Sequence, residues 1–190
     1  MEPIEQLSVI LPAISDLVDL VEADQLHHDT PCTNFDLSGV LDHMIGLGGT
    51  FSYLFRGEEP PSAEAGDVVV GDHNGDVPAA TFRRVMHDLL DSVRSDGAME
   101  RILPTPLGPM PGETFARLVA FDGLVHGWDI ARASGQPWEL PDEVVAAVDL
   151  FARNALTDDL RDGDTFKVAT TPPVDATPIE RVAAFSGRTV

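Results

Sequence analysis

The sequence predicts an all-α protein, a bundle of four main helices with extra short helices. Along several long segments, apolar residues recur at intervals of three and four, as they do on the buried face of a helix. Alternating strands and helices are missing, and residues 166–169 are the single candidate for a short strand. Short connections between seam-like apolar stripes favour a helical bundle.

The first helix is expected near the N-terminus, on the stripe formed by Ile4, Leu7, Leu11, Ile14, Val18 and Val21. Pro12 falls inside this stripe and marks either a kink or the start of the straight part of the helix. The second helix begins after Asn34 or Asp36, either of which can cap its N-terminus, and it ends at Gly57. A long acidic loop follows, from about residue 58 to residue 77.

The third helix opens at Pro78 and ends before Gly97. Residues 102–112 contain four prolines, which exclude a helix and favour a Pro-rich extended connection. This segment leads into the fourth helix, so it either covers a site there or forms a stiff surface connection. The fourth helix runs to Gly135.

Two shorter helices are expected after the bundle. The fifth starts at Pro141 and carries an apolar stripe of Val144, Val148 and Phe151. The last is indicated by Thr177-Pro178-Ile179-Glu180, which fits a capping box with proline at the first helical position.

Composition and charge describe one soluble domain over residues 1–190. The chain is 43% apolar and lacks both an apolar run of about 18 residues and a basic N-terminal region. We therefore expect no membrane association, no secretory signal and a cytoplasmic location. The 32 acidic residues against 12 basic ones give a net charge of −20, which argues against nucleic-acid binding because phosphates would meet a repulsive field.

Three residues on two predicted helices are candidate metal ligands: His43, Asp122 and His126. Asp122 and His126 are four residues apart, so on a helix they leave the same face, about 6 Å apart at Cβ. His43 is the one strongly polar member of an apolar stripe on the second helix. Two imidazoles and a carboxylate suit zinc or another divalent first-row metal, and they leave a coordination position open for water or substrate. Alternatively, His43 is a hydrogen-bonded core residue and the other two form an ion pair.

Residues beside these three have open roles. Asp129 either accepts a hydrogen bond from the His126 imidazole and fixes its tautomer, or caps the helix or pairs with Arg132. Trp128 and Arg132 flank the site and are candidates for substrate contacts. Core packing is the alternative for Trp128, and a surface ion pair is the alternative for Arg132.

The remaining histidines and the cysteine are expected to lie outside the site. His27, His28, His73 and His87 fall in polar loops or beside the apolar stripe of the third helix. Cys32 is the single cysteine, so no intramolecular disulfide can form, and a reducing compartment is consistent with this. Directly before a helix, Cys32 is expected to be a packed residue rather than a reactive thiol.

Three runs of sequence resemble the DinB-like superfamily. Residues 30–46, TPCTNFDLSGVLDHMIG, and 122–133, DGLVHGWDIARA, are similar to the N-terminal, metal-binding domain of mycothiol-dependent maleylpyruvate isomerase and to its single-domain actinobacterial relatives. The run PPVDATPIERV at 172–182 resembles the tail of those relatives, so the resemblance spans nearly the whole chain.

The resemblance implies a four-helix bundle that holds a divalent metal through His43, Asp122 and His126. The isomerase has glutamate at the acidic position, and Asp122 is one methylene shorter. The resemblance therefore implies that the helix approaches the ion more closely, or that the carboxylate binds through water.

Together, metal chemistry and resemblance lead us to expect a divalent-metal-dependent enzyme. It would be a thiol-dependent S-transferase or isomerase acting on a small electrophilic molecule. The metal is expected to be zinc, with nickel or iron as alternatives, and the resemblance implies mycothiol as the low-molecular-weight thiol. A metal with an open position can bind a thiol as thiolate, which lowers its pKa below the free value of about 8.5.

Two other hypotheses remain open. The chain could be a non-catalytic metal-binding or small-molecule-binding bundle, or a metal-free helical interaction domain. In the enzyme hypothesis the partner is a small-molecule substrate, and a homodimer is also expected because related bundles often pair.

Overall fold

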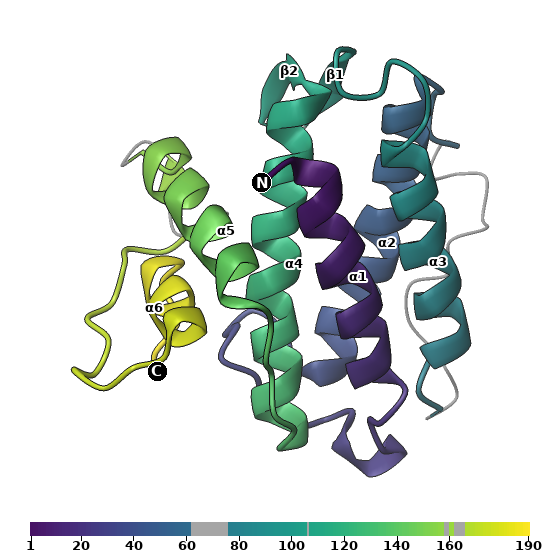
Figure 1. Cartoon of the computed structure of the whole chain (residues 1–190). Helices are drawn as coiled ribbons and strands as arrows, with labels where there is room; N and C mark the ends of the chain where they lie inside the picture. Colours follow the sequence, from purple (N-terminus) through teal and green to yellow (C-terminus); the bar gives the residue numbers. More distant parts are fainter. Residues whose placement is uncertain (62–75, 106, 158–159, 162–165) are drawn as a thin grey trace.

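The computed structural model describes residues 1–190 except 62–75, 106, 158–159 and 162–165 (Figure 1). Most of the predicted acidic loop therefore lies outside the described residues. Within them, the chain forms six α-helices, a single turn of 3-10 helix at Ala23–Gln25 and one small two-stranded sheet. The prediction of an all-α fold is confirmed.

Four long helices form the bundle. Helix α1 (Pro3–Val18) lies against both α3 (Ala79–Val93) and α4 (Gly112–Ser134), and α2 (Leu37–Arg56) lies against the same two helices. The contacts thus close a ring around one core, as Figure 1 shows. The largest fully buried side chains in this core are Phe55, Phe82, Phe121, Leu7, Ile10, Leu11, Ile14, Leu37, Leu41, Leu103, Leu124 and Ile130.

The predicted ends of α2 agree with the structure, whereas α1 ends at Val18, before the last residue of its predicted stripe, Val21. Helix α1 continues through Pro12, which is exposed, so the helix does not begin there. The Asp36 carboxylate caps α2 by accepting a hydrogen bond from the Gly39 N–H at 2.8 Å. Helix α2 ends at Gly57, whose φ of 74° is left-handed and favours glycine. Because both ends of α2 are defined in this way, the position of His43 along the helix is fixed.

The proline-rich connection forms an antiparallel hairpin of β1 (Ile102–Thr105) and β2 (Gly108–Pro111). Its backbone is extended, as predicted, and its prolines are tolerated because both strands of a two-stranded sheet are edge strands. The hairpin lies at one end of the bundle (Figure 1). It leads directly into α4.

Two further helices pack beside the bundle, against α4 and against each other: α5 (Asp142–Ala155) and α6 (Pro178–Phe185). The predicted capping box of α6 is present. The Thr177 hydroxyl accepts from the Glu180 N–H at 3.3 Å, and the Glu180 carboxylate accepts from the Thr177 N–H at 2.7 Å. Capped in this way, α6 directs the last residues of the chain back toward α4.

The candidate strand at residues 166–169 does not form, so that interpretation was wrong. No strand among the described residues pairs with it, and just after it the Thr170 N–H donates to the Ala184 carbonyl at the end of α6. The segment is instead an irregular connection held against α6.

None of the helices in the described part of the chain is long and apolar enough to cross a membrane.

Candidate metal site and cavity

Helices α2 and α4 bring His43, Asp122 and His126 together. One potential ligand atom from each residue lies within 4.8 Å of the others. The His126 Nε2 is 3.5 Å from the Asp122 Oδ1, and the His43 and His126 rings meet edge to face with centroids 5.0 Å apart. This spacing is compatible with three ligands that surround one ion of tetrahedral preference.

Asp129 orients the imidazole of His126. Its Oδ2 lies 3.0 Å from the His126 Nδ1, and its side chain is fully buried. A carboxylate only accepts hydrogen bonds, so neutral His126 carries its proton on Nδ1 and presents an unprotonated Nε2 toward Asp122. A hydrogen bond of this kind is usual for a metal-binding histidine. The contact between these two residues that the spacing suggested is therefore present.

Arg188, the third residue from the end of the sequence, completes this arrangement. Its Nη2 donates to the Asp129 Oδ2 at 2.9 Å, and its Nε donates to the Oδ1 at 3.4 Å. Burial acts to lower the pKa of Arg188, but the Asp129 carboxylate outweighs it and raises the pKa above its usual value. Asp129 thus pairs with Arg188, and Arg132 lies elsewhere.

A second group of potential ligands, Cys32, His126 and Asp129, shares one histidine with the first. In this group the Asp129 carboxylate already accepts hydrogen bonds from both His126 and Arg188. Burial also raises the pKa of the Cys32 thiol, which disfavours the thiolate that a metal requires. The first group is therefore the better candidate.

Burial lowers the pKa of His43 below its usual value near 6.5, and the nearby Asp122 carboxylate opposes this only partly. His43 is consequently neutral at pH 7, the form in which an imidazole can bind a metal. The ring of Phe35 lies beside it, with centroids 5.1 Å apart.

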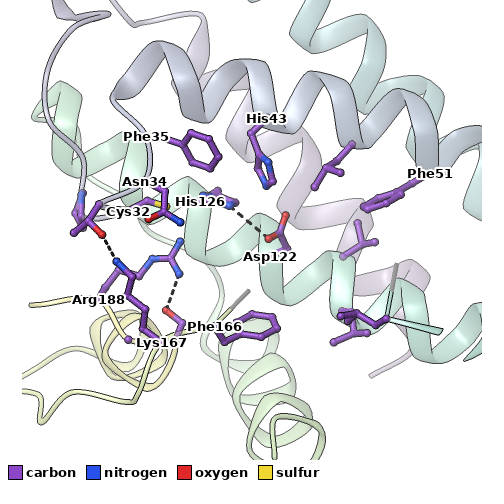
Figure 2. A pocket seen from close by; sticks show the side chains of 18 of the residues that line it. Cys32, Asn34, Phe35, His43, Phe51, Asp122, His126, Phe166, Lys167 and Arg188 are labelled. Atoms are coloured by element: carbon purple, nitrogen blue, oxygen red, sulfur yellow. Dashed lines mark hydrogen bonds and ion pairs between the residues drawn. The ribbon is translucent and has the colours of Figure 1, made fainter. Parts of the chain in front are cut away.

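The three residues open into a cavity of about 410 Å³, a size typical of small-molecule sites (Figure 2). Apolar side chains form much of its wall. These are Phe35, Leu47, Phe51, Leu107, Phe115, Leu118, Val119 and Phe166. Leu107 belongs to the turn of the β1–β2 hairpin, so the proline-rich segment does contribute to the wall of the site.

Trp128 and Arg132 line a different cavity, together with Trp138 and residues of α6. Trp128 is 4% exposed, and the Arg132 guanidinium stacks on its ring at 5.8 Å from the centroid. The structure therefore separates both residues from the cavity beside His43.

The histidines left out of the site lie away from it where the structure describes them. His28 Nδ1 lies 2.9 Å from the Ala133 carbonyl, His27 faces Asp36, and His87 faces Asp91 on the same helix. His73 lies outside the described residues. Cys32, expected to be packed, does pack against the core, but it also lines the cavity.

Lys167 and Arg188 line the cavity but were not identified from the sequence. Both follow α4 in the chain by more than thirty residues, and neither belongs to a periodic stripe. The one available signal was that Lys167 is the single lysine in the chain.

Known proteins resemble this chain in sequence and in fold. The family model of the mycothiol maleylpyruvate isomerase N-terminal domain matches residues 9–131, a range that contains His43, Asp122, His126 and Asp129. Uncharacterised proteins from two strains of Mycobacterium tuberculosis, CDC 1551 and H37Rv, are each 29% identical over 192 residues and are covered completely, as is this chain.

Among solved structures, the crystal structure of the mycothiol-dependent maleylpyruvate isomerase is similar, with a TM-score of 0.52 and 15% identity. The similarity covers 77% of this chain and 67% of that one. At this level of identity the likeness concerns the fold.

Proposed function

Because the chain belongs to the mycothiol maleylpyruvate isomerase N-terminal domain family, we propose that it is a divalent-metal-dependent enzyme. It would transfer a low-molecular-weight thiol, of the mycothiol type, to a small electrophile or isomerise that electrophile. The observation that carries the proposal is the convergence of His43, Asp122 and His126 at a cavity large enough for a small molecule.

In this proposal His43, Asp122 and His126 hold the ion, with zinc as the first choice and nickel or iron as alternatives. When bound, such an ion would supply positive charge that favours ionisation of a thiol at neutral pH. Asp129 keeps the Nε2 of His126 free of a proton, and Arg188 holds Asp129 in place. The apolar wall limits the access of water to the reacting groups.

The alternative is a bundle that binds a metal or a small molecule without catalysis. A structural metal site is usually closed by a fourth protein ligand, whereas a catalytic site keeps a position open. Within the described chain, the group around His43 contains three residues, and the cavity adjoins it. Both observations favour the enzyme.

Elemental analysis of the purified protein tests the metal site. We expect one divalent ion per chain, lost in His43→Ala and Asp122→Asn but retained in His87→Ala, the matched control on the surface of α3. Asp122→Glu should also retain the ion, because it keeps a carboxylate. Asp129→Asn should weaken binding about 10- to 100-fold, as is typical for partners of ligating histidines. Equal occupancy in wild type and His43→Ala would refute the site.

Chelation followed by a thermal melt distinguishes a metal-binding protein from the remaining hypothesis, a metal-free interaction domain. An ion present at 100 times its Kd should stabilise the folded chain by about 2.7 kcal/mol, and this stabilisation is lost on chelation.

A panel of thiols and electrophiles then tests catalysis. Consumption of the electrophile should require both thiol and metal and should fail with His43→Ala. A stably bound metal with no turnover across the panel would favour the non-catalytic alternative.

A further inference from the structure

The cavity is polarised along α2 and α4. These helices run antiparallel across it, because Phe51 meets Phe115 with ring centroids 4.7 Å apart, whereas His43 meets His126. Phe51 lies eight residues beyond His43, about 12 Å along the helix axis. The aromatic pair therefore marks one end of the cavity, and the three candidate ligands lie nearer the other (Figure 2).

The end beside Phe51 and Phe115 is apolar. Leu47, Leu118 and Val119 extend it along both helices. The charged side chains among the described lining residues are Asp122, Lys167 and Arg188, and the last two lie on the opposite side of Figure 2 from Phe51. The aromatic end therefore favours the uncharged hydrocarbon part of a ligand.

The opposite end contains the two cationic side chains. Arg188 reaches Asp129, which is one turn of α4 beyond His126. The Lys167 ammonium donates to the hydroxyl of Thr33, which precedes α2. Figure 2 shows both cations beside Cys32 and Asn34.

One of these positive charges lacks an ionic partner among the described residues. Arg188 is neutralised by its paired contact with Asp129, and Asp122 faces the proposed ion. Lys167 is half-buried, takes part in no ion pair within the described chain, and contacts a neutral hydroxyl instead. An ammonium without an ionic partner at this end of the cavity attracts an anionic group.

We infer that the cavity selects an elongated amphipathic electrophile, with an anionic group bound at Lys167 and an aryl or alkyl body packed against Phe51 and Phe115. The inference rests on the proposed function, because it takes the site of His43, Asp122 and His126 as the point where the substrate reacts. The reactive carbon would lie between the two ends of the ligand. Thr33 supplies a further polar contact for the anion.

Binding of unreactive probes to the full chain tests this inference without any assay of activity. The probes are 8-phenyloctanoate, 8-phenyloctan-1-ol and octanoate, measured by calorimetry. We expect the aryl carboxylate to bind at least tenfold more tightly than the alcohol or the shorter acid. Lys167→Met should lower the affinity for the aryl carboxylate about tenfold and leave the affinity for the alcohol unchanged. Lys167→Arg should preserve the preference for the acid. Arg84→Met, on the exposed face of α3, is the matched loss of a positive charge.

The apolar end is tested separately with Phe51→Ala. This variant should lower the affinities for 8-phenyloctanoate and 8-phenyloctan-1-ol by similar factors. The affinity for octanoate should change much less. Unchanged affinity of the alcohol in Lys167→Met also shows that the cavity is intact. Equal binding of acid and alcohol to the wild type would overturn the inference.

Each measurement is repeated on chelated protein, so that failure of this inference differs from failure of the proposed function. Preference for the acid should survive chelation, because Lys167 carries it. If the preference disappears on chelation but persists in Lys167→Met, the carboxylate binds the metal and the inference is wrong. If the protein binds no metal yet the preference still depends on Lys167, the anion subsite is supported and the proposed function fails.

Discussion

His43 couples the candidate site to pH. Burial lowers its pKa in the folded chain, with Asp122 opposing in part, whereas the unfolded chain has the ordinary value near 6.5. Between these two values the unfolded state binds more protons, so the free energy of unfolding rises with pH there. Below the folded pKa both states are protonated, and this contribution becomes constant.

We therefore predict that metal-free protein loses stability as the pH falls from about 7 through 6.5. The slope from His43 is at most about 1.4 kcal/mol per pH unit, the value for one proton. Urea unfolding of chelated protein at several pH values measures it. His43→Gln should remove this part of the slope, and His87→Gln, an exposed histidine on α3, should not. An identical slope in His43→Gln and wild type would assign the pH dependence to other groups.

The candidate site was predictable from the sequence only where helical spacing determines contact. Asp122, His126 and Asp129 share α4, so spacings of four and three residues placed them close together correctly. Placing His43 beside them also required knowing that α2 packs on α4, which the sequence resemblance supplied. Arg188 could not be found in this way, because it lies beyond the end of α6, 59 residues from Asp129 in the sequence.

At the scale of single elements, two adjacent glycines in α2 have opposite surroundings. A Cβ on Gly48 would lie 2.8 Å from the Val85 Cγ1 and 2.9 Å from the Met86 Cε on α3, whereas one on Gly49 would meet nothing within 4 Å. Gly48 therefore permits the close approach of α2 and α3. Gly49 has no such packing role, and its conformational entropy in the unfolded chain destabilises the helix.

We predict opposite effects of alanine at these two positions. Gly49→Ala should stabilise the folded chain by about 0.5–1 kcal/mol, because alanine has the higher helix propensity. Gly48→Ala should destabilise it by about 1–3 kcal/mol, because the new methyl group overpacks the α2–α3 contact. Denaturant unfolding measures both. Destabilisation of similar size in both variants would show that the difference in packing has no energetic consequence.

Elements were predictable where local chemistry defines their ends. Asp36, Gly57, Thr177 and Gly135 delimit helices through caps and left-handed turns that neighbouring residues specify. The hairpin at 102–111 was predicted only as extended chain, because proline patterns do not reveal which segment pairs with which. The strand considered at residues 166–169 failed for the same reason, since a strand requires a partner.

At the scale of the whole molecule, the net charge of −20 opposes compaction. Folding brings the acidic residues of the described chain closer together, and only some of them have basic partners there, such as Asp16 and Asp19 with Arg83. Exposed pairs of this kind contribute little to stability, because water and salt screen them. Repulsion among the remaining acids should therefore dominate the response of the chain to salt.

We predict that chelated protein melts at a higher temperature as NaCl rises from about 0.02 M to 0.5 M at pH 7. Screening shortens the range of repulsion from about 20 Å to less than 5 Å, and each kcal/mol gained corresponds to about 2–4 °C for a chain of this size. KCl at equal ionic strength should have the same effect. A melting temperature that falls with salt would show that attractive surface pairs outweigh the net charge.

A comparison of low and high salt also distinguishes metal in the candidate site from cations adsorbed on the acidic surface. Adsorption depends on the long-range field, so it should decline steeply with salt. Binding by His43, Asp122 and His126 depends on short contacts beside buried groups, so we expect one equivalent of metal to remain at 0.5 M NaCl. Equilibrium dialysis at low and high salt measures this, with His43→Ala as the control. Complete loss of metal from the wild type at high salt would reduce the observed binding to surface electrostatics.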